Sequence, residues 1–290
     1  MPETVGSVQT LWRYPVKSML GEEIESSEVT ERGLLGDRAY ALVDAETGKL
    51  VSAKRPRLWG RMFDFRASLA GAPQSGAVMP AATITMPDGV TLSTGDADAG
   101  DALSAAIGRK VTVSASAQPG AMIDEEWAEA KGDSKYGVPV PGADGVLASP
   151  AAFAAPGTFF DLSAIHFVTT AALSRLQEVY PDGEVDSRRF RPNIIIEAPG
   201  SDFVENAWTG RRLTIGDEVR LSVMVPMIRC VMTTLPQGGG NLRSDPGILK
   251  ALAQHNRVSV FNLGELPCIG MAASVLQGGV VSVGDAVRLE

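Results

Sequence analysis

The chain has 290 residues, of which 44% are hydrophobic and 21% charged, and its formal net charge is -8. This balance is typical of a globular protein and excludes a disordered or fibrous chain, while the length allows two domains. Nucleic acid and anionic membranes select basic faces, so an acidic surface excludes both as expected partners. Against such a surface, a local cluster of Arg and Lys would stand out as a site for a small anion.

The N-terminus, MPETVGSVQTLWRYPVKSML, has no basic segment followed by an apolar run, and no apolar stretch in the chain reaches about 18 residues. We therefore expect neither export nor membrane insertion, and predict a cytoplasmic protein. The two cysteines, Cys230 and Cys268, predict reduced thiols and no disulfide framework. The two histidines, His166 and His255, have no partner at the spacing of a zinc site.

Short alternating runs rich in β-branched residues, separated by turn signals, predict strands in the first part of the chain. They lie at residues 7–14, 39–44 and 49–53, and a hairpin in TITMPDGVTLS turns at Asp88-Gly89. The segment DADAGDALSAAIG predicts a helix with an Asp cap and a Gly stop. This part is interpreted as a small β-barrel or sandwich.

Residues 117–157 are rich in Ala, Gly and Pro and show no periodicity. They predict a long connection, which is either disordered or a functional loop.

The remaining sequence predicts a strand at residues 164–169 that leads into an amphipathic helix with Leu173, Leu176 and Tyr180 on one face. A strand in FRPNIIIEA, a hairpin in LTIGDEVRLSVMV, a helix capped by Asp245-Pro246 and terminal strands in VSVGDAVRLE follow. The sequence similarity between LTIGDEVRL and VSVGDAVRL predicts two paired hairpin elements that close one barrel.

The stretch PMIRCVMTT places Arg229 directly before Cys230. A neighbouring positive charge stabilises a thiolate, so we expect Cys230 to ionise more readily than an ordinary cysteine. A thiolate is a soft ligand that suits a transition metal already bound to sulfur. The alternative is a buried structural cysteine, which is the more frequent role of a free cysteine.

Basic residues occur at several predicted strand ends and turns. They are Lys17, Arg38, Arg55, Arg57, Arg188, Arg189 and Arg191. The planar fork of Arg suits phosphate, and Ser18, Thr169 and Thr170 are further donors, although no Gly-rich phosphate motif is present. Asn193 is either a structural hydrogen-bonding residue or a ligand, and His166 is interpreted as a core histidine.

Six motifs in this order resemble the MOSC family with its N-terminal β-barrel domain: YPVKS, GLLGDRAYALVD, SAKRPRL, FRPNIII, IRCVMTT and VSVGDAVRLE. The sequence is similar to the branch that includes the mitochondrial amidoxime-reducing component and its bacterial relatives. The resemblance implies a mostly β protein with a few helices. It also implies an N-terminal MOSC-type β-barrel domain at residues 1–116, a connection at 117–157 and a MOSC domain at 158–290.

The resemblance also implies a molybdenum cofactor, Mo-molybdopterin, with Cys230 as the ligand to the metal. The residues implied around the pterin and its phosphate are Lys17, Ser18, Arg38, Thr169, Thr170, Arg191, Asn193 and Arg229. The family usually continues its cysteine motif with Val-Asp-Pro, where this chain has Leu235-Pro236-Gln237, and an acidic position of the family is Thr170 here. Both differences bear on the choice of substrate.

The implied function is an oxidoreductase that acts on small N-oxygenated substrates. The chain ends at Glu290 without the four-cysteine cluster of a ferredoxin-like domain, so we expect electrons from an external electron-transfer protein. The alternatives are a sulfur-transfer or cofactor-carrier MOSC protein, in which Cys230 is a nucleophile or persulfide carrier, and an enzyme that cleaves carbon–sulfur bonds.

Overall fold

The computed structural model describes residues 2–118, 121–124, 157–238, 241–260 and 264–290. Most of the predicted connection at 117–157 lies outside these described residues. The strands are β1 (Glu3–Arg13), β2 (Glu22–Ile24), β3 (Ser26–Thr30), β4 (Gly33–Leu34), β5 (Ala41–Asp44), β6 (Arg66–Leu69), β7 (Ala82–Thr85), β8 (Thr91–Ser93), β9 (Val111–Ser114), β10 (Ile165–Thr169), β11 (Ile194–Glu197), β12 (Arg212–Ile215), β13 (Val219–Ile228), β14 (Arg257–Ser259), β15 (Glu265–Gln277), β16 (Gly279–Ser282) and β17 (Ala286–Leu289). The helices are α1 (Pro56–Trp59), α2 (Ala99–Ile107), α3 (Thr170–Val179) and α4 (Pro246–His255).

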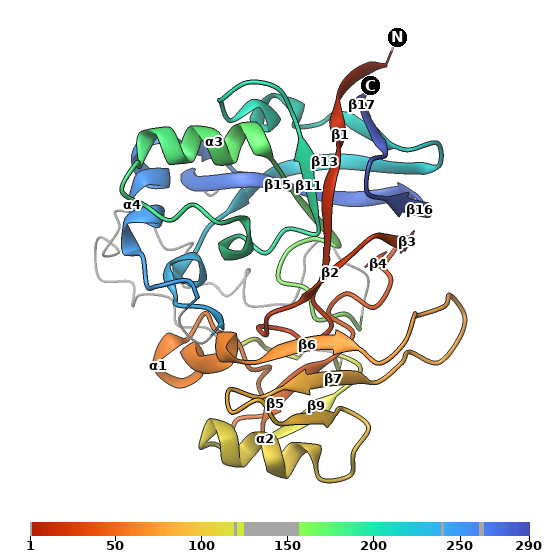
Figure 1. Cartoon of the computed structure of the whole chain (residues 1–290), viewed down its shortest axis with the longest axis vertical. Helices are drawn as coiled ribbons and strands as arrows, with labels where there is room; N and C mark the ends of the chain where they lie inside the picture. Colours follow the sequence, from red (N-terminus) through yellow and green to blue (C-terminus); the bar gives the residue numbers. More distant parts are fainter. Residues whose placement is uncertain (1, 119–120, 125–156, 239–240, 261–263) are drawn as a thin grey trace.

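The largest sheet is a closed barrel. Its strands follow the order β10-β11-β1-β17-β12-β13-β15, and the pairing of β10 with β15 closes the circle. Among these pairs only β10 and β11 are parallel, as expected for two strands joined through helix α3. The predicted mostly β fold is therefore confirmed. Figure 1 shows the barrel strands at one end of the molecule and strands β5 to β9 with helix α2 at the other.

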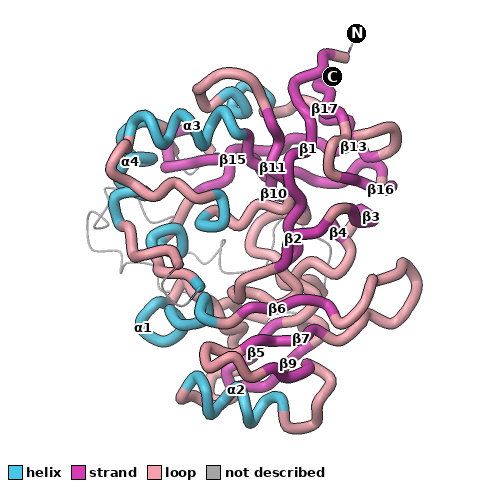
Figure 2. The backbone as a smooth tube through the Cα atoms, in the orientation of Figure 1, coloured by secondary structure: helices cyan, strands magenta, loops and turns pink. Residues whose placement is uncertain are grey.

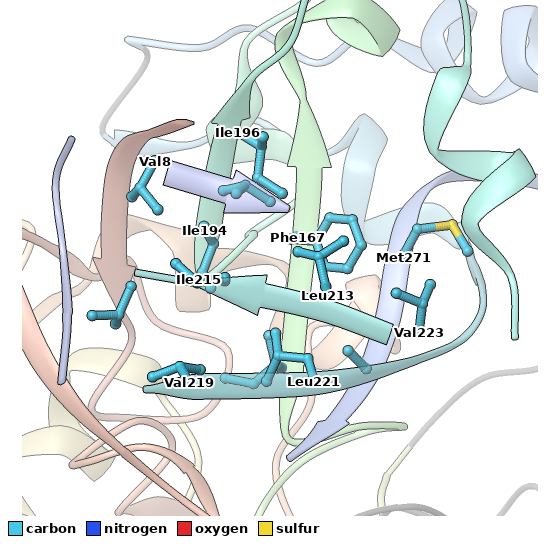
Figure 3. Close-up of a cluster of buried hydrophobic side chains, with 14 of the residues drawn as sticks. Val8, Phe167, Ile194, Ile196, Leu213, Ile215, Val219, Leu221, Val223 and Met271 are labelled. Atoms are coloured by element: carbon cyan, nitrogen blue, oxygen red, sulfur yellow. The ribbon is translucent and has the colours of Figure 1, made fainter. Parts of the chain in front are cut away.

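The barrel encloses an apolar core because alternate residues of each strand face inward. Strand β13 contributes Val219, Leu221 and Val223, and these pack against side chains from the other strands (Figure 3). On β11, Ile194 and Ile196 belong to this core, whereas Ile195 faces the other way. Ile195 packs under helices α3 and α4, which cover the outside of the barrel at this point (Figure 2).

The N-terminal part of the chain contributes to both ends of the molecule. Strand β1 is a member of the barrel, where Ser7 lies opposite Glu197 of β11 and Ala286 of β17. The sheet β6-β7-β8, the pair β5-β9 and helix α2 surround a second core that contains Trp59 and Phe63. The predicted domain boundaries at residues 116 and 157 stay a prediction.

The second core reaches the cysteine segment. Met232 is one of its buried members, and Cys230 and Leu235 pack against it. Because β13 ends at Ile228, the two residues after this barrel strand carry the chain from the barrel to the second core. Cys230 thus lies where the two parts of the molecule meet.

Several local predictions are confirmed. The hairpin at Asp88-Gly89 joins β7 to β8, and helix α2 ends at Gly108, whose φ of +80° is the left-handed conformation that glycine adopts without strain. Helix α4 begins as predicted, since the Asp245 carboxylate accepts a hydrogen bond from the Gly247 amide at 3.1 Å.

Two predictions are wrong. Residues 49–53 form no strand, because Leu50 makes only isolated bridges to Val43 and Ile123. The segment VSVGDAVRLE is not a hairpin: β16 pairs with β3, and β17 pairs with β1 and β12. The strands diverge because the Val8 amide donates to the Asp285 carbonyl at 2.9 Å and draws β17 toward β1.

No helix among the described residues is long and apolar enough to cross a membrane.

Candidate functional site

A cavity of about 180 Å³ lies where the barrel meets the N-terminal part of the chain. Its wall combines the turn after β1, the start of β10, the segment before β11 and the end of β13. The basic residues of the wall are Lys17, Arg38, Lys54, Arg189, Arg191 and Arg229. The described lining residues include one carboxylate, Asp161, and one thiol, Cys230. The electrostatic character of the cavity is therefore positive, in a chain that is acidic overall.

Most of the residues predicted for the site meet at this cavity. The predicted residues that line it are Lys17, Ser18, Arg38, Arg191, Asn193, Arg229 and Cys230. Thr169 and Thr170 do not line it, although both were predicted to. Among the other basic residues picked from the sequence, Arg55 pairs with Asp124 at 3.0 Å and Arg188 with Asp186 at 2.6 Å, so both are held away from the cavity.

The backbone is strained at three cavity residues. Ser18, Arg38 and Arg191 have φ values of +63°, +46° and +54°, and they are the non-glycine residues with positive φ in the described part of the chain. Each such conformation costs about 1–3 kcal/mol and persists only where the surroundings impose it. Hydrogen bonds hold the segments in place: the Arg38 amide donates to the Tyr14 carbonyl at 2.8 Å, and the Ser18 hydroxyl accepts from the Ala53 amide at 3.2 Å.

The ring of Tyr14 supports two of the arginines. The guanidinium carbons of Arg38 and Arg191 lie 4.5 and 4.2 Å from its centroid, within the range of cation–π attraction. Burial raises the pKa of the Tyr14 hydroxyl to about 12 even though both arginines oppose the shift, so the ring stays neutral. Burial and the nearby Arg38 lower the pKa of Arg191 to about 10, and its guanidinium remains charged at neutral pH.

Two buried arginines of the wall have no carboxylate partner among the described residues. Arg191 donates to the Met19 carbonyl at 2.6 Å. Arg229 donates to the carbonyls of Ile269, at 2.7 and 3.0 Å, and of Phe190, at 3.0 Å. Carbonyl dipoles solvate a guanidinium without neutralising its charge. An anionic ligand in the cavity would therefore complete a site that the protein leaves positively charged.

Arg229 also connects to a carboxylate through a peptide group. The Ile269 carbonyl accepts from Arg229, and the Gly270 amide of the same peptide donates to the Glu205 carboxylate at 3.2 Å. Glu205 is fully buried, and this burial raises its pKa to about 7 against the effect of a 2.6 Å hydrogen bond from the Thr169 hydroxyl. The carboxylate lies behind the cavity wall and does not line it.

The two threonines bond within the strand-to-helix junction and do not line this cavity, so their predicted place in the cofactor site stays a prediction. The Thr169 hydroxyl accepts from the Ala172 amide at 3.1 Å and so caps helix α3. The Thr170 hydroxyl donates to the Ala198 carbonyl at 3.1 Å and accepts from the Ala198 amide at 3.0 Å. Thr169 is the last residue of β10 and Thr170 is the first of α3, whereas the cavity is at the start of β10, beside His166.

Asn193 lines the cavity, but its amide is used within the protein. Its Oδ1 accepts from the His166 amide at 3.1 Å, and its Nδ2 donates to Asp37 at 2.9 Å and to the Trp12 carbonyl at 3.3 Å. These bonds tie β10 and β1 to the residue that directly precedes β11. Of the two roles that the sequence left open, the structure favours the structural one.

The expectation that Arg229 makes Cys230 ionise more readily is wrong. Burial raises the pKa of the Cys230 thiol and outweighs the opposing charges of Lys54 and Arg229. Although the two residues are adjacent in sequence, the Arg229 guanidinium binds carbonyls of the barrel side. Cys268 is also buried, its thiol donates to the Leu266 carbonyl, and burial raises its pKa to about 12.

Three lining residues were missed or misjudged in the sequence: Lys54, Asp161 and His166. Lys54 directly precedes the basic pair that was selected from SAKRPRL. His166 is buried as predicted for a core histidine, but it also lies on the cavity wall, with Arg229 at its Nε2. Burial and the nearby Arg229 lower its pKa well below the usual value, so its ring is neutral. Asp161 has no local signal in the sequence.

Comparison with known proteins gives matches over both parts of the chain. The family model of the MOSC domain matches residues 156–288, and that of the MOSC N-terminal beta barrel domain matches residues 5–106. The chain is 28% identical to Mitochondrial amidoxime-reducing component 1 of Homo sapiens, over 99% of this chain and 84% of that protein. The Mus musculus protein of the same name is 26% identical, over 99% and 83% of the two chains.

Among solved structures, the YUAD protein from Bacillus subtilis aligns with a TM-score of 0.46 and 11% identity, covering 100% of this chain and 98% of that one. The two family models match in the order in which the sequence motifs occur, and the barrel and the cavity lie in the matched segments. The chain therefore belongs to the MOSC domain family and carries an N-terminal MOSC β-barrel domain.

Proposed function

We propose that the chain binds a molybdenum cofactor in this cavity and uses it to reduce small N-oxygenated substrates, with electrons from a separate redox protein. The observation that carries the proposal is the strained backbone of Ser18, Arg38 and Arg191, because three costly conformations meet at the wall that also holds Cys230. Membership of the MOSC family supports the cofactor. The relatives named as amidoxime-reducing components support the type of reaction.

The residues present fit such a cofactor. Its phosphate needs donors with positive charge, and Arg191 is a buried cation without a carboxylate partner in the described part of the chain. Its metal needs a soft ligand that can carry negative charge, and the thiol of Cys230 lines the cavity. A metal that coordinates this thiol displaces its proton, so the raised pKa of the free thiol is no obstacle.

Each group of the wall has a separate task in this proposal. Lys17, Arg38 and Arg191 would hold the anionic part of the cofactor, while Cys230 would hold the metal. The apolar wall, which includes Phe159, Phe160 and Met227, would exclude water and strengthen these electrostatic contacts. When bound, the cofactor supplies the two-electron reduction. The net reaction converts an N-hydroxyl group to N–H with two electrons and two protons, and releases one water.

Metal analysis tests the cofactor. The wild type, Cys230→Ala and Cys268→Ala are purified from a host that makes molybdenum cofactor, and molybdenum and pterin are measured per chain. Near-stoichiometric contents are expected in the wild type and in Cys268→Ala, since Cys268 is buried in an apolar cluster. A large loss of molybdenum is expected in Cys230→Ala alone. A wild type free of metal and pterin would refute the proposal.

Two further measurements separate this function from its alternatives. Reduction of an N-hydroxylated amidine with a chemically reduced viologen removes the need for a partner protein, and no turnover by a fully loaded wild type would refute the reaction type. Intact-mass spectrometry of the same sample reports a persulfide on Cys230. A persulfide in a molybdenum-free protein would favour sulfur transfer.

A further inference from the structure

The carboxylate of Asp161 lies among the basic residues of the cavity. It forms an ion pair with Lys17, and its second oxygen lies 3.7 Å from the ammonium nitrogen of Lys54. Lys17 is 4% exposed and also donates to the Phe159 carbonyl at 2.8 Å, so its ammonium group is largely shielded from bulk water although the residue lines the cavity. Asp161 is 37% exposed, so its carboxylate can turn outward into solvent.

Asp161 and Lys17 keep one another charged. Burial lowers the pKa of Lys17, and the carboxylate opposes this shift. Partial loss of hydration disfavours the charge on Asp161, but Lys17 and Lys54 outweigh it and hold the pKa of the carboxyl far below its usual range. Without a counter-charge a buried ammonium is costly, so an oxygen with negative charge at this point stabilises the charged form of Lys17.

We propose that Asp161 holds the place of the ligand's anionic group, and that an oxyanion such as a phosphate exchanges for its carboxylate on Lys17 and Lys54. The exchange keeps Lys17 paired throughout. The displaced carboxylate returns to water, where its solvation is favourable, and the incoming oxygens take over both ammonium groups. This inference rests on the proposed function only for the identity of the natural ligand.

The proposed exchange and its two alternatives predict different changes in oxyanion affinity when the carboxylate is removed. If the ligand displaces Asp161, as proposed, removal of the carboxylate raises the affinity of every oxyanion by the same factor, because each must break the same ion pair. If Asp161 stays in place and only repels the ligand, a dianion gains about twice as much on a logarithmic scale as a monoanion, since Coulomb energy is proportional to charge. If Asp161 supports Lys17 in the bound state, its removal weakens binding.

The test uses the full chain from a host that makes no molybdenum cofactor. Methyl phosphate, a dianion at pH 8, and dimethyl phosphate, a monoanion, are titrated at constant ionic strength and followed by ³¹P NMR. The neutral variants are Asp161→Asn and Asp161→Ser, so that a folding defect in one leaves the other. The control is Asp88→Asn, which removes the same charge at an exposed turn between β7 and β8.

Both neutral variants should bind both ligands more tightly by a common factor of about fivefold, the upper value for one partly exposed ion pair. Asp88→Asn should match the wild type. Unchanged or weaker binding in the neutral variants, a clearly larger gain for methyl phosphate, or no binding by the wild type would overturn the inference. Molybdenum content is measured separately, in protein from a host that makes the cofactor. If that protein holds no molybdenum while the neutral variants still bind both phosphates more tightly, the proposed function is refuted and this inference stands.

Discussion

Gly270 offers a sharp test of how the cavity wall is built. Its φ is +72°, and a Cβ at this position would lie 2.5 Å from the Phe167 carbonyl oxygen and 2.6 Å from the His166 Nε2. Gly270→Ala should therefore cost about 1–2 kcal/mol for the left-handed backbone and about 1–3 kcal/mol for the steric conflict. The conflict also pushes His166 away from Arg229, so we expect a lower molybdenum content in the loaded protein.

The control is Gly210→Ala. Gly210 precedes β12 in the same barrel, has φ of +78°, and has nothing within 4 Å of an added Cβ. It isolates the backbone cost, so the free energy of unfolding in urea should fall by about 1–2 kcal/mol. Gly270→Ala should fall further by the cost of the conflict. Equal losses in the two variants would refute the packing described around His166.

Three further predictions concern other residues of the site. Arg191→Met removes a buried cation and should weaken cofactor retention by about tenfold or more, measured as pterin per chain after dialysis; unchanged retention would contradict the role of Arg191. Glu205 has a pKa of about 7 in the folded protein against an ordinary 4.5, so the folded state binds its proton more tightly than the unfolded state. Its contribution to the free energy of unfolding should therefore fall by up to about 3 kcal/mol as pH rises between these values. Urea unfolding measured against pH should show this slope in the wild type and not in Glu205→Gln. Thr170→Val removes two hydrogen bonds to Ala198 and should cost about 1–3 kcal/mol without changing molybdenum content; a loss of molybdenum would return Thr170 to the site.

Features set by short stretches of sequence were predictable. The hairpin at Asp88-Gly89, helix α2 before Gly108 and the start of α4 at Asp245 all follow from turn and cap chemistry. The confirmed mostly β architecture follows from alternation, because a half-buried strand requires it. The strand expected at residues 49–53 failed because alternation alone does not supply a hydrogen-bonded partner strand.

The site was predictable only in part, because its residues come from distant parts of the chain. Arg38 and Arg191 stood out as basic residues at turns, and the structure brings both to the ring of Tyr14. The position of Asp161 depends on an ion pair with Lys17, 144 residues away, and no local pattern reports such a contact. Thr169 was a suitable donor by type, but its hydroxyl is used by α3 and Glu205.

The peptide between Ile269 and Gly270 links the cavity wall to a charge that lies outside the cavity lining. Arg229 binds its carbonyl and Glu205 its amide, so the two charges are coupled through one peptide dipole although their side chains do not meet. A change of charge at Glu205 therefore alters the field at the Arg229 guanidinium, on the barrel side of the cavity wall. Substitutions confined to the lining residues would not reveal this coupling. Sequence variation at Glu205 would change the electrostatic potential of the cavity wall while every lining residue stays the same.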